Sequence, residues 1–255
     1  MMNPAEFANI ARAERDFWWY RGMRRILFRL LDPVFLRSRF HRALEAGCGT
    51  GHFAQAMTER YGVRMFPSDL EWEGLRHGKR LGVARLTQAD IGALPFTSGA
   101  FDLVLSLDVI VHLPRGEEGR AMEELTRVLK PGGMLVLRVA ALDLLRSRHS
   151  RFAHERQRFT RRRLRSLVER HGLEVLRSTY ANSLLSPVAW FKFRIVEPLL
   201  GLKVESGVQP VSPWLDRALY APLEWESRWI GSGRDFPVGQ SLILLARKAE
   251  QNGNE

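Results

Sequence analysis

Three alternating glycines mark the stretch of this sequence that is best suited to bind a ligand. Residues 43–54 read ALEAGCGTGHFA, so an apolar run ends in the carboxylate of Glu45, the glycines follow, and a helical pattern begins. Glycines let a main chain approach a ligand closely and turn sharply into a helix, whose N-terminal amides favour an anion. A plain connecting turn would not require three of them, and we therefore expect a ligand-binding loop here.

Two cofactor classes fit this loop. Residues 49–54 match the dinucleotide pattern G-x-G-x-x-A, and Asp69 follows about 20 residues on, where an acid holds a ribose. Glu45 favours a different ligand, because a carboxylate at the strand end suits a cationic group better than a pyrophosphate. Asp90, after the third predicted strand, could accept a hydrogen bond from an adenine amino group. The residues favour a ligand with a ribose, an adenine and an ammonium group but no phosphate.

Alternating strands and helices position these residues. Strand patterns occur at 42–46, 63–66, 83–86, 101–107, 134–139, 173–180 and 241–247, and helical patterns at 53–61, 70–81, 120–129 and 161–171. This alternation indicates βαβ units and a parallel sheet covered on both faces. The predicted fold class is therefore α/β, a Rossmann-like doubly wound sheet, with the site at the carboxyl ends of the strands near the reversal of strand order.

Two segments lie outside that alternation. Residues 5–32 carry apolar side chains at helical spacing up to Pro33, which predicts an N-terminal helix that ends there. Residues 181–239 hold four tryptophans and six prolines and are expected to form an aromatic-rich cap. The economical division is one domain over 1–255: a helical segment at 1–35, a cofactor-binding core at 40–180, the cap insertion at 181–239 and a final strand at 240–248.

The composition is ordinary for a globular enzyme, with 255 residues of which 45% are hydrophobic and 26% charged. The uncharged stretch at 180–191 is too short to span a membrane, and Glu6 and Glu14 are unlike a secretory signal. Cys48 is the single cysteine, which permits no internal disulfide and no multi-cysteine zinc site, so no metal is expected. These features predict a cytoplasmic protein and leave its oligomeric state open.

Several separate motifs, in order along the chain, resemble the class I S-adenosylmethionine-dependent methyltransferases. Residues 45–51 resemble motif I of that family, 94–104 its approach to strand four, and 129–133 the loop before strand five. The sequences FWWYRG at 17–22 and RFT at 158–160 resemble a bacterial subgroup of small-molecule, type 11-like enzymes. The resemblance covers roughly 16–180, and it implies S-adenosylmethionine as cofactor, S-adenosylhomocysteine as product and an antiparallel C-terminal strand in the sheet.

The resemblance also places the cofactor contacts. Asp69 sits where the family binds the ribose hydroxyls and Asp90 where it binds adenine, although Pro67 stands where glycine is common. The residues expected to contact the cofactor are Tyr20, Glu45, Ala46, Gly47, Cys48, Gly49, Gly51, Asp69, Leu70, Asp90, Ile91, Ser106 and Leu107.

Catalytic candidates follow the fourth and fifth predicted strands. Methyl transfer from a sulfonium is an in-line displacement, so alignment supplies much of the catalysis, and a base is needed only when the acceptor loses a proton. Asp108 and His112 follow strand four, and His149 and His154 follow strand five. His112 is the preferred base, although Val111 precedes it where the family often has glutamate. Asp108 would orient it or cap the next turn, and each histidine could equally be structural or solvated.

Arginine makes the chain basic. The 39 Lys and Arg residues against 28 Asp and Glu give a net charge of +11, and ten arginines lie within 146–170. Such a run favours an anionic partner or forms a solvated helix face. Its start, beside His149 and His154, could face a methyl acceptor, whereas 161–165 are expected to face solvent.

The expected function is methyl transfer to an oxygen of a bulky, partly hydrophobic small molecule, such as a natural product, a quinone-like compound or a lipid-linked sugar. The acceptor could be anionic. The mixture of aromatic and basic residues at 189–202 suggests contact with the inner face of a membrane. Nucleic acid is less favoured as a partner, because no Asn/Asp-Pro-Pro-aromatic motif lies near strand four and no RNA-binding module is recognisable. A cofactor-binding regulator without turnover is the third hypothesis.

Overall fold

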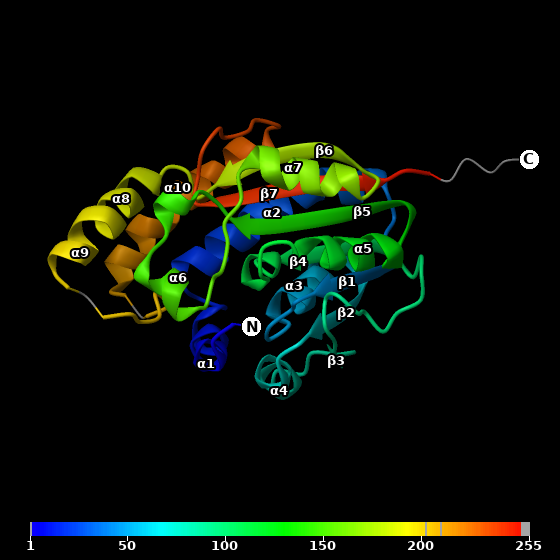
Figure 1. The fold of residues 1–255 in the computed structure, drawn as a ribbon, viewed down its shortest axis with the longest axis horizontal. Helices are drawn as coiled ribbons and strands as arrows, with labels where there is room; N and C mark the ends of the chain where they lie inside the picture. Colours follow the sequence, from blue (N-terminus) through cyan, green and yellow to red (C-terminus); the bar gives the residue numbers. More distant parts are fainter. Residues whose placement is uncertain (1, 202, 210, 251–255) are drawn as a thin grey trace, which may run out of the picture.

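The computed structural model describes residues 2–201, 203–209 and 211–250, which form a seven-stranded sheet with helices on both faces (Figure 1). The strand order is β3-β2-β1-β4-β5-β7-β6. Neighbours from β3 to β5 are parallel, and β7 is antiparallel to both β5 and β6. The α/β fold class and the antiparallel C-terminal strand are confirmed. The strands are β1 (Arg42–Ala46), β2 (Arg64–Asp69), β3 (Thr87–Gln88), β4 (Phe101–Leu107), β5 (Leu129–Ala140), β6 (Leu173–Ala181) and β7 (Ser241–Lys248).

Two apolar layers hold the helices to the sheet. Val104 belongs to the layer beneath α5 and α7, and Leu103 belongs to the layer beneath α2, α3 and α10. Successive side chains of a strand point to opposite faces, so one apolar run serves both layers. The covering helices are α2 (Trp18–Arg37), α3 (His52–Tyr61), α5 (Glu118–Val128), α7 (Arg161–Arg170) and α10 (Pro213–Gly231).

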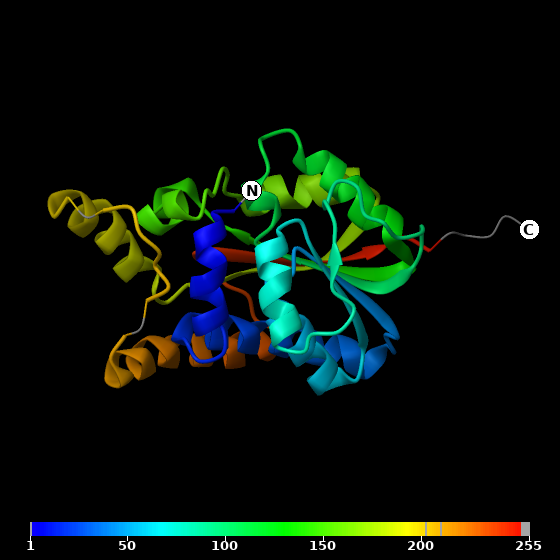
Figure 2. The ribbon, with the colours of Figure 1, turned by 90° about the horizontal axis from the view of Figure 1, so that it is seen from below.

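The N-terminal segment forms two helices where the sequence predicts one. α1 (Pro4–Ala13) lies beside α4 (Trp72–Arg80), and α2 turns away from it along the sheet (Figure 2). Phe17 is extended, with φ −66° and ψ 134°, and separates the two helices. Pro33 lies inside α2 rather than at its end. The helix continues for one further turn in which Phe35 stacks on Tyr61 at 3.9 Å between ring centroids.

Three strands differ from the prediction by more than one residue at a boundary. The third strand is Thr87–Gln88 and not 83–86, because Val83 N–H donates to Gly78 O and so closes the preceding helix. β2 runs on through Pro67 to Asp69. β5 begins at Leu129, ahead of the expected Met134, and the register with β4 shifts there, so the Pro-Gly-Gly sequence forms an irregular start of the strand.

The segment between β6 and β7 divides into two structural parts. α8 (Ser186–Phe191), the π-helical turn η3 (Lys192–Val196) and α9 (Glu197–Leu199) project beyond the carboxyl ends of the strands (Figure 1). α10 instead lies along α2 (Figure 2), to which the Arg21–Asp216 ion pair joins it at 2.6 Å. We refer to 186–209 as the cap.

The described residues contain no helix that is both long and apolar enough to cross a bilayer. Within the same residues, no three His, Cys, Asp or Glu side chains are grouped so as to hold a metal ion.

Candidate active site

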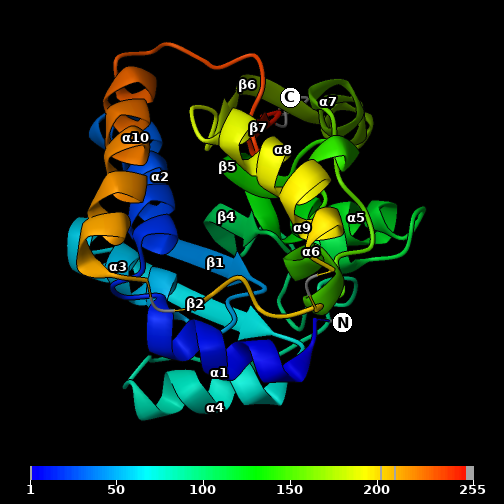
Figure 3. The same cartoon turned by 90° about the vertical axis from the view of Figure 1, so that its left-hand side faces the viewer.

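A cavity of about 600 Å³ opens at the carboxyl ends of β1, β2, β4 and β5, where the strand order reverses. α1, the cap and the short helix α6 (Arg148–Phe152) surround it (Figure 3). Predicted site residues that line the cavity are Tyr20, Glu45, Gly47, Cys48, Gly49, Asp69, Leu70, Asp90, Ile91, Leu107, Asp108, His112 and His149. The cavity therefore lies where the doubly wound fold predicts a ligand.

The glycine loop is folded in a way that only glycine allows. Gly47 has φ +84°, and a Cβ placed on it would lie 2.1 Å from Val109 Cγ2. The backbone amides of Gly47 and Cys48 both donate to Ser68 O, at 2.7 and 2.8 Å, which ties the loop to the end of β2. The main chain thus forms the cavity wall itself, with no side chain at Gly47 to keep a ligand away.

Glu45 presents a buried carboxylate to this cavity. Its side chain is 3% exposed, and Oε2 has no hydrogen-bond partner among the described residues. Burial raises the pKa of Glu45 to about 8, and the Ala54 amide and the positive charge of Arg138 lower it by less. A buried carboxylate oxygen without a partner is costly unless a ligand satisfies it, and a cationic group would do so.

Asp69 and Asp90 line the same wall. Asp69 accepts hydrogen bonds from the amides of Gly49, at 2.7 Å, and Glu71, at 2.9 Å. Each carboxylate oxygen has a second lone pair, so both can still accept from a ligand hydroxyl. Burial raises the pKa of Asp69 above its usual value. Asp90 is exposed at the rim, where its Oδ1 accepts from Gly92 N–H at 2.8 Å.

Four predicted residues do not line the cavity. Ala46 and Ser106 are buried within the sheet, and Gly51 caps the start of α3 in a left-handed conformation. His154 has an exposed side chain and a left-handed backbone, and only its carbonyl reaches toward the cavity. These residues were predicted from their positions near the ends of strands. Such a position does not determine the direction in which a side chain points.

His112 lies in the cavity wall as a neutral imidazole. Its Nδ1 is 3.3 Å from His154 O, and because a carbonyl can only accept, the ring proton is assigned to Nδ1. The lone pair on Nε2 is then the one available to take a proton. Burial lowers the pKa of His112, which keeps the ring neutral.

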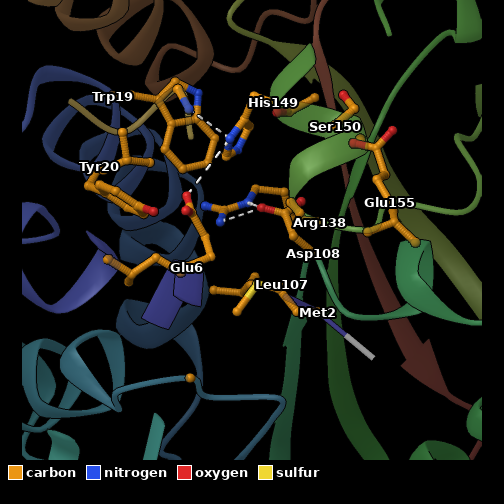
Figure 4. A pocket seen from close by; sticks show the side chains of 18 of the residues that line it. Met2, Glu6, Trp19, Tyr20, Leu107, Asp108, Arg138, His149, Ser150 and Glu155 are labelled. Atoms are coloured by element: carbon orange, nitrogen blue, oxygen red, sulfur yellow. Dashed lines mark hydrogen bonds and ion pairs between the residues drawn. The ribbon is translucent and has the colours of Figure 1, made fainter. Parts of the chain in front are cut away.

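Asp108 does not orient His112 through a hydrogen bond. It pairs instead with Arg138 of β5, whose Nε and a terminal nitrogen lie 2.9 and 2.7 Å from Asp108 Oδ2. The Arg138 guanidinium also stacks over Trp19, 5.2 Å from the ring centroid. Figure 4 shows Arg138 between Trp19, Asp108 and Glu6, so the cavity wall includes a cation that was not among the predicted site residues.

His149 is held with a proton on the opposite nitrogen. Gly207 N–H of the cap donates to His149 Nδ1 at 2.9 Å, so the neutral ring carries its proton on Nε2 and presents a donor. Glu6 of α1, which is 1% exposed, accepts from Ser206 Oγ at 2.9 Å and lies 3.8 Å from the same Nδ1 (Figure 4). Glu6 therefore joins α1, α6 and the cap, a role that its sequence position gave no sign of.

Glu14 is a second buried acid that the sequence analysis did not select. Thr50 Oγ1, within the glycine loop, donates to the Glu14 carboxylate at 2.5 Å. Burial raises the pKa of Glu14 to about 7, against the effect of this hydrogen bond and of Arg24. No local pattern links two residues 36 positions apart, so only the fold reveals the contact.

Several arginines of 146–170 form hydrogen bonds and ion pairs within the protein. Arg158 is buried and donates to Ala141 O at 3.0 Å, Ser150 Oγ at 2.8 Å and Glu155 Oε1 at 2.6 Å. Arg163 pairs with Glu118 at 2.6 Å, although 161–165 were expected to face solvent. Within the run, Arg148 and Arg158 line the cavity beside His149.

The comparisons with known proteins agree with this geometry. Residues 44–137 match the family described as "Methyltransferase domain". The malonyl-[acyl-carrier protein] O-methyltransferase of Enterobacter lignolyticus is 36% identical over 108 residues, which cover 42% of each chain. The mitochondrial arginine-hydroxylase NDUFAF5 of Danio rerio is 34% identical over 110 residues, covering 42% of this chain and 34% of the relative. This chain spans less than half of the length of either relative.

A solved structure shares the fold over almost the whole chain. The SAM-dependent methyltransferase of Archaeoglobus fulgidus superposes with a TM-score of 0.58 at 17% identity, covering 92% of this chain and 97% of the other. The family match and the sheet together confirm the expected resemblance, and residues 44–137 are a class I S-adenosylmethionine-dependent methyltransferase domain. S-adenosylmethionine is the cofactor of that class.

Proposed function

We propose that this protein transfers a methyl group from S-adenosylmethionine to an oxygen atom of a bulky, partly hydrophobic small molecule. The observation that carries the proposal is the buried Oε2 of Glu45, which has no hydrogen-bond partner among the described residues and lies beside a glycine loop. These features suit a cofactor with an ammonium group, and they leave the rest of the cavity for an acceptor. When bound, the cofactor supplies an electrophilic methyl group on a sulfonium.

The residues of this wall fit the parts of that cofactor. Glu45 would hold the ammonium group, Asp69 the ribose hydroxyls, and Asp90 the adenine amino group. Gly47 gives the close approach that the main chain needs. Asp108 balances the positive charge of Arg138 next to Glu45, which reduces the repulsion between that guanidinium and an incoming ammonium group.

The other half of the cavity suits a partly hydrophobic acceptor. Trp19, Leu145 and Phe193 supply apolar surface, while the Nε2–H of His149 offers a donor. The Nε2 lone pair of His112 would take the proton of an acceptor hydroxyl. A carboxylate acceptor would need no base, because its oxygen carries no proton to remove. The similarity to a malonyl-[acyl-carrier protein] O-methyltransferase supports oxygen as the methylated atom.

Two alternatives predict different products. An enzyme for RNA or DNA needs an open basic surface, but Arg158 and Arg163 are engaged in internal ion pairs, which argues against it. A regulator that binds the cofactor without turnover would bind S-adenosylhomocysteine and transfer nothing.

The test is transfer of a radiolabelled methyl group to cell extracts separated into lipid, small-molecule and RNA pools. We expect label in the lipid or small-molecule pool. Label confined to RNA, or no label despite measurable cofactor affinity, would refute the proposal in favour of one alternative. His112→Gln should lower turnover of a hydroxyl acceptor, whereas His154→Asn, outside the cavity and in a backbone conformation that asparagine tolerates, should not.

A further inference from the structure

The cap carries an apolar stripe on its outer side. Phe191, Ile195 and Leu199 recur at intervals of four residues, and all are exposed. Phe191 is 52% exposed and Leu199 81%. A helix that faces only water carries polar residues at such positions. The inner side is formed by Ala189 and Glu197, which are buried, so the apolar stripe is the side that the described residues leave uncovered.

Further apolar and basic residues lie at the same end of the molecule. Trp214, 71% exposed, is on the first turn of α10, and Figure 3 looks onto the end that α10 and the cap share. The exposed basic residues of 184–217 are Lys192, Arg194, Lys203 and Arg217, and the exposed acid among the described residues there is Glu205. Glu197 is buried and paired with Arg148. The end of the molecule formed by the cap and the start of α10 therefore combines exposed apolar side chains with a net positive charge.

The stripe adjoins the cavity. Val188 and Lys192 line it from the same helical segment that carries Phe191 and Leu199 outward. If the stripe bound to another surface, that surface would lie next to the side of the cavity that the cap forms. An amphipathic acceptor could then pass from that surface to the cavity without its apolar part crossing water.

We propose that the outer face of the cap, defined by Phe191, Ile195 and Leu199, docks on an anionic lipid bilayer together with Trp214 of α10. The apolar side chains enter the boundary between headgroups and acyl chains, and the basic residues around them pair with lipid phosphates. As an extension that rests on the proposed function, the methyl acceptor is a lipid taken from that bilayer. A second copy of the chain is a poorer occupant, because it would bring two sets of like charges together.

The test is co-sedimentation of the whole chain, without cofactor, with vesicles of phosphatidylglycerol and phosphatidylethanolamine in equal parts. We expect binding that weakens as salt is added and is weaker on phosphatidylcholine vesicles. Phe191→Asp/Leu199→Asp should lower the partition coefficient by about tenfold or more, because it removes apolar side chains from the bilayer and adds charge. Leu36→Asp, at an 87% exposed site on α2, is the matched control and should bind as the wild type does.

The basic residues are tested separately. Lys203→Glu/Arg217→Glu should lower binding by about tenfold or more at low salt, and Arg37→Glu/Arg39→Glu, equally exposed at the end of α2, should lower it less. Equal binding by the stripe variant and the wild type would overturn the proposal. So would a dimer in light scattering that the stripe variant dissociates. Affinity for S-adenosylhomocysteine should be unchanged in all these variants, so loss of docking and failure of the proposed function are distinguishable.

Discussion

Cofactor affinity should depend on pH through Glu45. The carboxyl is protonated in the free protein below its pKa of about 8, because burial disfavours its charge. Only the ionised form pairs with the ammonium group of S-adenosylhomocysteine. Affinity should therefore rise with pH up to about 8, since binding at lower pH must first remove the Glu45 proton.

The size of this pH effect on cofactor affinity follows from the fraction of Glu45 that is ionised. Apparent affinity should fall about tenfold for each pH unit below 8, so it is about a hundredfold lower at pH 6 than its limiting value. Arg138, Glu14 and Asp69 also face Glu45. Glu14 loses its own proton near pH 7 and, by adding negative charge, flattens the slope above that pH. The ligand ammonium itself begins to lose its proton near pH 8, which limits the useful range to about pH 6 to 7.5.

Isothermal titration with S-adenosylhomocysteine in buffers of different ionisation enthalpy measures both the affinity and the proton released. We expect close to one proton released per ligand bound at pH 6. Glu45→Gln should bind weakly and with little pH dependence. A wild-type affinity that is constant from pH 6 to 7.5, with no proton release, would refute the assignment of Glu45 to the cationic group.

Three further predictions concern stability. Burial raises the pKa of Glu45 in the folded protein above the ordinary 4.5, so its contribution to the free energy of unfolding becomes less favourable as pH rises from 4.5 to 8. Glu45→Gln should therefore be more stable than the wild type by up to about 3 kcal/mol at pH 7. Urea unfolding should show little difference between the two proteins at pH 4. Gly47→Ala should lower Tm by several degrees and cofactor affinity by over tenfold, because its Cβ meets Val109. Gly62→Ala, at φ +66° with open space around it, should cost only about 1 kcal/mol of backbone strain. Glu226→Ala should cost about 2 to 3 kcal/mol in urea unfolding, since its buried carboxylate accepts two backbone N–H groups at 2.7 Å; a loss below about 0.5 kcal/mol would contradict that role.

The sequence was sufficient where local patterns determine structure. Residues 103–105 and 242–246 are apolar without interruption, as expected of strands buried on both faces, and both strands are present. The glycine loop was predictable because Gly47 and Gly49 need positive φ. β3 was misplaced because a two-residue edge strand buries little and leaves almost no periodic signal.

The sequence was insufficient where the site depends on contacts between distant segments. His149 and Glu6 are more than 140 positions apart, and the protonation of His149 depends on Gly207 of the cap. Arg138 is the one charged residue within the predicted strand 134–139, and its pairing with Asp108 requires the register of β4 with β5. Tertiary geometry alone decides which nitrogen of each histidine is free.

Calorimetric titration of the purified chain with S-adenosylhomocysteine and, separately, with NAD at pH 7.5 tests the central claim most directly, because the loop pattern in isolation fits both cofactor classes. Our account predicts saturable binding of one S-adenosylhomocysteine per chain, lost in Asp69→Ala, and no heat with NAD. Binding of NAD with no response to S-adenosylhomocysteine would contradict it.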